Sequence, residues 1–135
     1  MDASITLAWV LDDRVPTYAV RVRQALTVPS VRAIVPAIWH LEIANVLAVA
    51  ERRKILSADD ISFALAQVEE FAAKAIESHN DFISARRALN TARTFQLSAY
   101  DSVYLDAALT RRLPLATLDK SLRSAAARAG VQLFN

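Results

Sequence analysis

The chain has 135 residues, enough for one domain with a buried core, and 54% of them are hydrophobic while 22% are charged. This balance excludes a disordered or fibrous protein, and a net charge of +2 gives only a weak preference for polyanions. The absence of cysteine excludes disulfides, thiolate zinc sites and cysteine nucleophiles, and the single glycine, Gly130, excludes glycine-rich nucleotide loops.

The apolar residues are distributed along the whole chain. No apolar run reaches the roughly 18 residues expected of a membrane span, and no charged leader precedes Asp2. We therefore expect a cytoplasmic protein that does not enter a membrane. No Pro, Gly or Ser cluster divides the sequence and no repeat is present, so residues 1–135 are expected to form one domain.

The first half of the chain predicts four helices and one short strand. Pro16 separates the first two helices, and Pro36 is expected to open the third, because the first turn of a helix does not need its missing N–H. Ser57 and Asp60 have the spacing of a capping box at the start of the fourth. The expected elements are helices over 4–11 and 17–26, a strand over 31–35, and helices over 36–54 and 57–75.

The second half of the chain also predicts helices that alternate with short strands. Asp81 and Ser98 are expected to cap helices, and Gly130 is expected to close the last one. The expected elements are a strand over 76–78, helices from 81 to 94 and from 98 onward, a strand over 113–117, a helix over 119–129 and a strand over 131–134. Short apolar strands between helices predict an α/β fold, a single α/β/α sandwich around a short parallel sheet.

Two acidic side chains fall on helix faces that are otherwise apolar. At about 100° per residue, Asp101 shares its face with Tyr104 and Leu105, and Glu42 shares its face with Val46. An ionised carboxylate is rarely buried unless it is paired, protonated or bound to a metal. A shared cation would account for both positions. A structural, hydrogen-bonded Glu42 remains an alternative.

Two further acids, Asp2 and Asp119, stand at expected junctions between strands and helices. Ligands of open parallel sheets bind beyond the carboxyl ends of the strands, where such junctions lie. Each acid also has a purely structural interpretation. Asp119 is placed to cap the last helix, and Asp2 or Ser4 to cap the first. Asp101 likewise follows Ser98 by three residues and is placed to complete that cap.

If the four acids converge, they need a cation. Two carboxylates about 4 Å apart repel by about 4 kcal/mol at an effective dielectric near 20. Oxygen ligands from Asp and Glu favour Mg²⁺ or Mn²⁺ over zinc. Asn45 can reach the same polar cavity as Glu42, and Ser4 and Thr117 are placed to contact water or phosphate there. His40 points away from Glu42 and His79 is expected in a loop, so we expect neither to bind the metal.

Four segments together point to a family: Asp2-Ala3-Ser4, Trp39-His40-Leu41-Glu42-Ile43-Ala44-Asn45, Leu97-Ser98-Ala99-Tyr100-Asp101 and Leu115-Ala116-Thr117-Leu118-Asp119. In this order they resemble PIN-domain ribonucleases, most closely the VapC-type toxins of bacterial toxin-antitoxin systems. Members usually have a short apolar strand before the first acid. Here only Met1 precedes Asp2, so we expect this strand to be truncated or reduced to a stub.

The resemblance implies a fold, an activity and partners. The implied fold is a small α/β/α sandwich, and the activity is Mg²⁺- or Mn²⁺-dependent endonucleolytic cleavage of RNA, leaving 5′-phosphate and 3′-hydroxyl ends. The acidic metal site matches Asp2, Glu42, Asp101 and Asp119, with Ser4, Asn45 and Thr117 in supporting places. A cognate antitoxin that inhibits cleavage and a homodimer are implied as well.

Two other functions stay open from the sequence. The first is a catalytically silent module of the same fold that pairs with a protein or RNA. The second is a phosphohydrolase or phospho-acceptor with Asp2 as nucleophile, but Ser4 occupies the position where the haloacid-dehalogenase-like pattern needs a second Asp.

Overall fold

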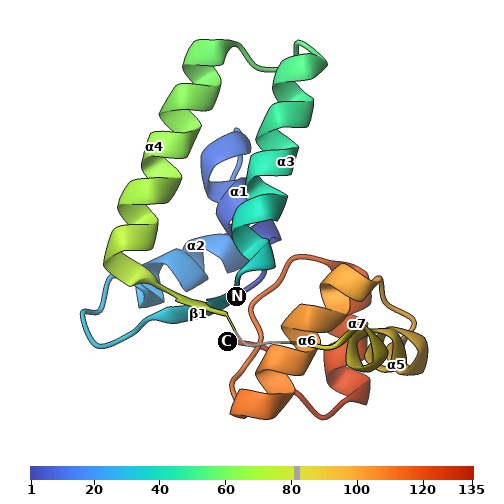
Figure 1. Ribbon diagram of the computed structural model, residues 1–135. Helices are drawn as coiled ribbons and strands as arrows, with labels where there is room; N and C mark the ends of the chain where they lie inside the picture. The colour runs from blue at the N-terminus through green and yellow to red at the C-terminus, as the bar shows by residue number, and fades with distance from the viewer. Residues whose placement is uncertain (81–82) are drawn as a thin grey trace.

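The computed structural model describes residues 1–80 and 83–135, in which seven helices and two parallel strands form a mixed α/β fold that is mostly helical. The helices are α1 (Ala3–Leu11), α2 (Thr17–Ala25), α3 (Ile38–Arg52), α4 (Ala58–Ala75), α5 (Ala85–Phe95), α6 (Ala99–Arg111) and α7 (Lys120–Arg128). The strands are β1 (Ala33–Pro36) and β2 (Ile76–His79). Figure 1 shows α3 and α4 as a helical pair extending from the strands, with α5, α6 and α7 gathered on the other side of the molecule.

Side-chain caps start most of these helices where the sequence predicted them. The capping box of α4 is confirmed, because the Ser57 hydroxyl accepts from the Asp60 N–H at 3.1 Å and the Asp60 carboxylate accepts from the Ser57 N–H at 2.9 Å. The predicted cap at Asp81 lies outside the described residues. The described helix α5 begins later than predicted, at Ala85, because the Ser84 hydroxyl caps it by accepting from the Arg87 N–H.

The two strands pair in parallel, with Ala33 opposite Ile76 and Pro36 opposite His79. The prediction that Pro36 opens the third helix is wrong, since it is the last residue of β1. The ladder continues past it, because the Ala37 N–H donates to the His79 carbonyl at 3.1 Å. Helix α3 therefore begins only at Ile38.

The strands predicted over 113–117 and 131–134 are not formed as strands. These segments meet only in an isolated parallel bridge between Leu115 and Leu133. Two hydrogen bonds make this bridge, from the Leu115 N–H to Gln132 at 2.9 Å and from the Phe134 N–H to Leu115 at 3.0 Å. The next N–H on that side of the segment belongs to Leu113 and donates to the Ala108 carbonyl at 3.0 Å, so the pairing is not extended toward the start of the segment.

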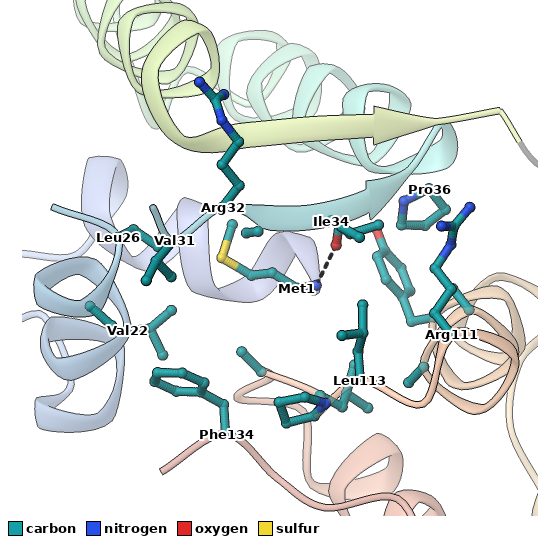
Figure 2. Close-up of a pocket in the computed structure, with 18 residues that line it drawn as sticks. Met1, Val22, Leu26, Val31, Arg32, Ile34, Pro36, Arg111, Leu113 and Phe134 are labelled. Carbon is teal, nitrogen blue, oxygen red and sulfur yellow. Dashed lines mark hydrogen bonds between the residues drawn. The ribbon is translucent and has the colours of Figure 1, made fainter. Parts of the chain in front are cut away.

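The N-terminus lies between β1 and the Leu115 segment, at the position of a central strand. The Met1 amino group donates to the Ile34 carbonyl at 2.8 Å, and the Asp2 N–H donates to the Ala116 carbonyl at 2.9 Å. Figure 2 shows Met1 and its bond to Ile34. Residues 1 and 2 therefore lie where the expected first strand would end, between β1 and the Leu115 segment, and Asp2 stands directly before α1.

The main core contains the largest fully buried side chains, among them Trp39 of α3 and Tyr104 and Leu105 of α6. A second cluster packs α1 on α2, where the Trp9 indole donates to the Ala19 carbonyl at 2.8 Å. Within the described ranges, no helix has both the length and the apolar character needed to cross a membrane.

The buried N-terminus predicts a pH dependence of stability. Burial lowers the pKa of the Met1 ammonium from 8.0 to about 6, and the charge of Asp2 only partly opposes this. The unfolded chain therefore binds more protons than the folded chain between these values. The free energy of unfolding should rise by about 2 kcal/mol as the pH increases from 6 to 8. Urea titrations across this range measure it. N-terminal acetylation is the control and should remove this contribution, so an unchanged slope in the acetylated chain would contradict the assignment.

Candidate functional site

Asp2 is held by hydroxyl groups from both ends of the chain. It is only 7% exposed and caps α1. One of its carboxylate oxygens accepts from the Ser4 hydroxyl at 2.6 Å and from the Thr117 hydroxyl at 2.5 Å. The Ser4 hydroxyl in turn accepts from the Leu118 N–H at 3.0 Å. Ser4 and Thr117, both expected in supporting places, therefore fix the Asp2 carboxylate.

Glu42 lies on the inward face of α3, as its neighbours in the sequence predicted, and it is half-buried. Its carboxylate accepts a hydrogen bond from the hydroxyl of Tyr104, which is buried in α6. This contact joins α3 to α6 through two residues that are 62 positions apart in the sequence. Burial and the neighbouring Glu42 raise the pKa of Tyr104, so its hydroxyl keeps its proton and remains a donor.

The pKa of the Glu42 carboxyl depends in part on two of the other predicted acids. Burial raises the pKa of Glu42 and the negative charges of Asp2 and Asp101 raise it further, while the bond from Tyr104 opposes the shift. Ionised Glu42 is therefore disfavoured in the folded state. Its contribution to stability is full below the ordinary pKa of 4.5 and is lost as the pH rises through the raised value. The fold thus brings three of the four acids into one electrostatic neighbourhood.

Asp101 is half-buried in the first turn of α6. Its backbone N–H donates to the Ser98 hydroxyl at 2.9 Å, and that hydroxyl donates back to the Asp101 carboxylate at 2.7 Å. The interpretation that Ser98 and Asp101 form a helix cap is therefore confirmed for the Asp101 N–H. The carboxylate keeps a second oxygen for which the described residues show no hydrogen bond.

Asp119 has the cap geometry predicted as its structural alternative. It is exposed, and its carboxylate accepts from the Leu122 N–H at 2.7 Å at the start of α7. Its own N–H donates to the Thr117 hydroxyl at 3.0 Å. Asp119 is thus linked to Asp2 through one threonine side chain, but it does not contribute to the raised pKa of Glu42.

The donor set fits a hard divalent cation in its chemistry, since every candidate ligand is a carboxylate oxygen and negative charge accumulates around Glu42. Across residues 1–80 and 83–135, however, no three Asp, Glu or His side chains stand close enough to hold one ion. Each of the three carboxylates is hydrogen-bonded to a hydroxyl instead, those of Ser4 and Thr117, Tyr104, and Ser98. Binding of an ion would therefore require these side chains to turn toward one another.

The remaining predicted residues lie outside this group. Asn45 is exposed, and the described residues show no hydrogen bond between it and Glu42. The His40 ring is hydrogen-bonded to Ser78 at 2.7 Å. The prediction that His79 lies in a loop is wrong. It is the last residue of β2, and its ring contacts Glu77 at 2.8 Å.

Two functional candidates were missed from the sequence. Tyr104 was assigned only as an apolar neighbour of Asp101. Its position on the same helix face as Asp101 could have indicated that its hydroxyl lies near the acidic group. Arg123 of α7 donates to the Thr117 carbonyl at 3.1 Å and lies 5.0 Å from the centre of the Tyr18 ring. It is therefore a cation adjacent to the Asp2 network. Nothing in its sequence context distinguishes it from the other arginines.

Comparison with known proteins adds no family assignment: no protein-family model matches the chain, and no curated protein matches it significantly. The geometry of the site is therefore the basis for its interpretation.

The bond between Tyr104 and Glu42 gives a direct prediction. The Tyr104 hydroxyl lowers the pKa of Glu42 and so opposes the rise that burial causes. Tyr104→Phe removes this donor, so the pKa of the Glu42 carboxyl should rise further. NMR titration of the glutamate carboxyl carbons measures this. Tyr100→Phe is the matched control, because Tyr100 is on the same helix and is 62% exposed. Equal titration of Glu42 in both variants and the original chain would contradict the assigned contact.

Proposed function

We propose that this chain is a Mg²⁺- or Mn²⁺-dependent endoribonuclease of the PIN type. The observation that supports it most directly is the electrostatic coupling of Asp2, Glu42 and Asp101, which come from α1, α3 and α6. Acids that raise one another's proton affinity favour a cation between them. The order of the four acidic segments in the sequence, which resembles that family, supports the same function.

In this proposal Asp2, Glu42 and Asp101 would hold the ion, with Asp119 at the edge of the site. When bound, the ion would lower the pKa of the attacking water and stabilise the charge that develops on the phosphate. Hydrolysis adds water to phosphorus and breaks the bond to the 3′ oxygen, leaving 5′-phosphate and 3′-hydroxyl ends. Burial and the neighbouring acids raise the pKa of Glu42, and the charge of a bound cation would oppose that shift. Arg123 is a cation placed to hold an RNA phosphate beside the acids.

The PIN-type α/β/α sandwich belongs to this proposal too. The described sheet has two strands, but the Met1–Asp2 stub and the Leu115–Leu133 bridge extend the same parallel arrangement on one side. Parallel strands connected by helices are typical of that architecture.

A toxin role, with a cognate antitoxin, a homodimer and a cytoplasmic location, is the biological form of the proposal and rests on the resemblance. On the α3–α4 side of the molecule, such a partner could cover three large exposed apolar side chains. Leu41 is 67% exposed and Phe63 is 70% exposed, as is Ile55 between the helices at 69%. Large exposed apolar side chains of this kind are common at protein interfaces.

Binding of Mn²⁺ tests the metal site separately from catalysis. A ligand that binds only the folded chain stabilises it by about 2.7 kcal/mol at a concentration of 100 times its Kd. We expect Mn²⁺ to raise the melting temperature of the original chain and to have little effect on Glu42→Gln. Equal shifts in both proteins would place the ion elsewhere.

Cleavage of a mixed RNA substrate with Mn²⁺, and with a chelator, tests the activity itself. The expected result is metal-dependent cleavage with 5′-phosphate ends. RNA binding without cleavage would instead support the catalytically silent module. The separation of the carboxylates in the described residues favours that second function.

A further inference from the structure

The three acids that surround Glu42 and include it share one pattern of hydrogen bonding. Each carboxylate gives one oxygen to a hydroxyl group. Oδ2 of Asp101 accepts from Ser98, and Oε2 of Glu42 accepts from Tyr104. Within the described part of the chain, the second oxygen of these two carboxylates accepts no hydrogen bond, and Oδ1 of Asp2 accepts only from a backbone N–H at 3.4 Å. Each acid therefore has one oxygen held by a hydroxyl and a second oxygen that is free or weakly bonded.

The hydroxyl of Tyr104 differs from those of the serines. Ser4 and Ser98 contact acids two and three residues away, so these contacts are local to one helix start. Tyr104 reaches Glu42 from another helix, and its side chain is only 1% exposed and packed in the main core. The core thus fixes the place of this hydroxyl, and the hydroxyl fixes one oxygen of Glu42.

The same hydroxyl has a second partner at the start of α1. The backbone N–H of Ala3 donates to the Tyr104 oxygen. Ala3 is the first residue of α1, and the N–H groups of a first helical turn have no acceptor within their own helix. One buried hydroxyl therefore links the residue that follows Asp2 to the carboxylate of Glu42.

We propose that Tyr104 is the positioning residue of the candidate metal site, where its hydroxyl holds one oxygen of Glu42 beside the start of α1 and leaves the other oxygen to bind a divalent cation. This inference rests on the proposed function, because it concerns the same ion. The hydrogen bond does not block the ion, since a carboxylate held by one oxygen can still turn the other toward Asp2 and Asp101. Partners that orient a ligating carboxylate typically change metal affinity by about 10- to 100-fold.

The Kd for Mn²⁺, measured on the intact chain by electron paramagnetic resonance of the free ion, tests the proposal without RNA or catalysis. Tyr104→Phe keeps the buried ring and removes only the hydroxyl, and we expect it to weaken Mn²⁺ binding about tenfold or more. Tyr100→Phe is the matched control, since Tyr100 is on the same helix and is 62% exposed, and its Kd should equal that of the original chain. Circular dichroism at the temperature of the titration verifies that each variant is folded.

A double-mutant cycle separates positioning from a general effect on packing. If Tyr104 acts through the Glu42 carboxylate, adding Tyr104→Phe to Glu42→Gln should change the remaining Mn²⁺ affinity by less than about twofold. An equal loss of affinity in both backgrounds would show that the tyrosine acts on the fold and would overturn the proposal.

Hydrogen exchange of the Ala3 amide tests the link in the metal-free protein. Tyr104→Phe removes the acceptor of this N–H, so the amide should exchange faster, whereas Tyr100→Phe should leave it unchanged. An unchanged Ala3 amide in Tyr104→Phe would overturn the proposal. Equal Mn²⁺ affinity of Tyr104→Phe and the original chain would overturn it too and leave the proposed nuclease intact, whereas no Mn²⁺ binding by the original chain would overturn both.

Discussion

Asp101→Asn is expected to reduce metal-dependent RNA cleavage at least about 100-fold, because loss of a ligand charge removes several kcal/mol of transition-state stabilisation. The fold should survive this change. The helix cap at this position depends on the Asp101 N–H and the Ser98 hydroxyl, which the asparagine variant keeps. Initial cleavage rates on one RNA, together with melting curves, separate activity from stability.

Asp59→Asn is the matched control for this substitution. Asp59 also lies in the first turn of a helix, α4, but it is exposed and remote from the acidic group. It should retain full cleavage. Glu42→Gln should lose activity as Asp101→Asn does, since both remove a charge from the same electrostatic neighbourhood. Undiminished, chelator-resistant cleavage by Asp101→Asn would refute the proposed mechanism.

The largest effect on stability is expected at Trp39. Its side chain is fully buried in the main core, so Trp39→Ala should lower the free energy of unfolding by about 3 to 5 kcal/mol through lost burial and an unfilled cavity. Denaturant titration followed by circular dichroism measures this loss. A change of that size is a large fraction of the total stability of a small domain.

Trp39→Phe distinguishes loss of packing from loss of a polar contact. The Trp39 indole N–H is buried and has no hydrogen-bond partner in the described residues. Replacing it with an apolar edge removes an unpaired donor while keeping much of the ring. We therefore expect a far smaller loss than for alanine. If phenylalanine is as destabilising as alanine, the indole N–H has a partner that this structure does not show.

The helices could be predicted because their ends are set by local chemistry. The Ser57–Asp60 and Ser98–Asp101 pairs act within one helical turn, so their spacing in the sequence already contains the geometry. Gly130 was likewise predicted after α7, where its φ of 72° suits a residue without Cβ.

The strands were harder to predict because a strand is completed by a neighbour distant in sequence. The 113–117 and 131–134 segments have the apolar residues typical of strands but form only one bridge. Pro36 has the sequence context of a helix start, but it pairs with His79 in the sheet. Local pattern does not contain this information.

The candidate site, too, could be predicted from the sequence only in part. The inward position of Glu42 followed from helical periodicity, but its Tyr104 partner depends on how α3 and α6 pack. The caps at Asp101 and Asp119 were foreseen as local alternatives and are present. The coupling of Asp2, Glu42 and Asp101 depends on three separate elements, so only the complete fold shows it.

The bond from Thr117 to Asp2 joins residues 115 positions apart, so the Asp2 carboxylate acquires this donor only after Thr117 has left the ribosome. A growing polypeptide therefore carries Asp2 and Glu42 long before the threonine that orders the first of them is available. In the proposed nuclease, this order of assembly would keep the site incomplete until Thr117 has been translated and folded.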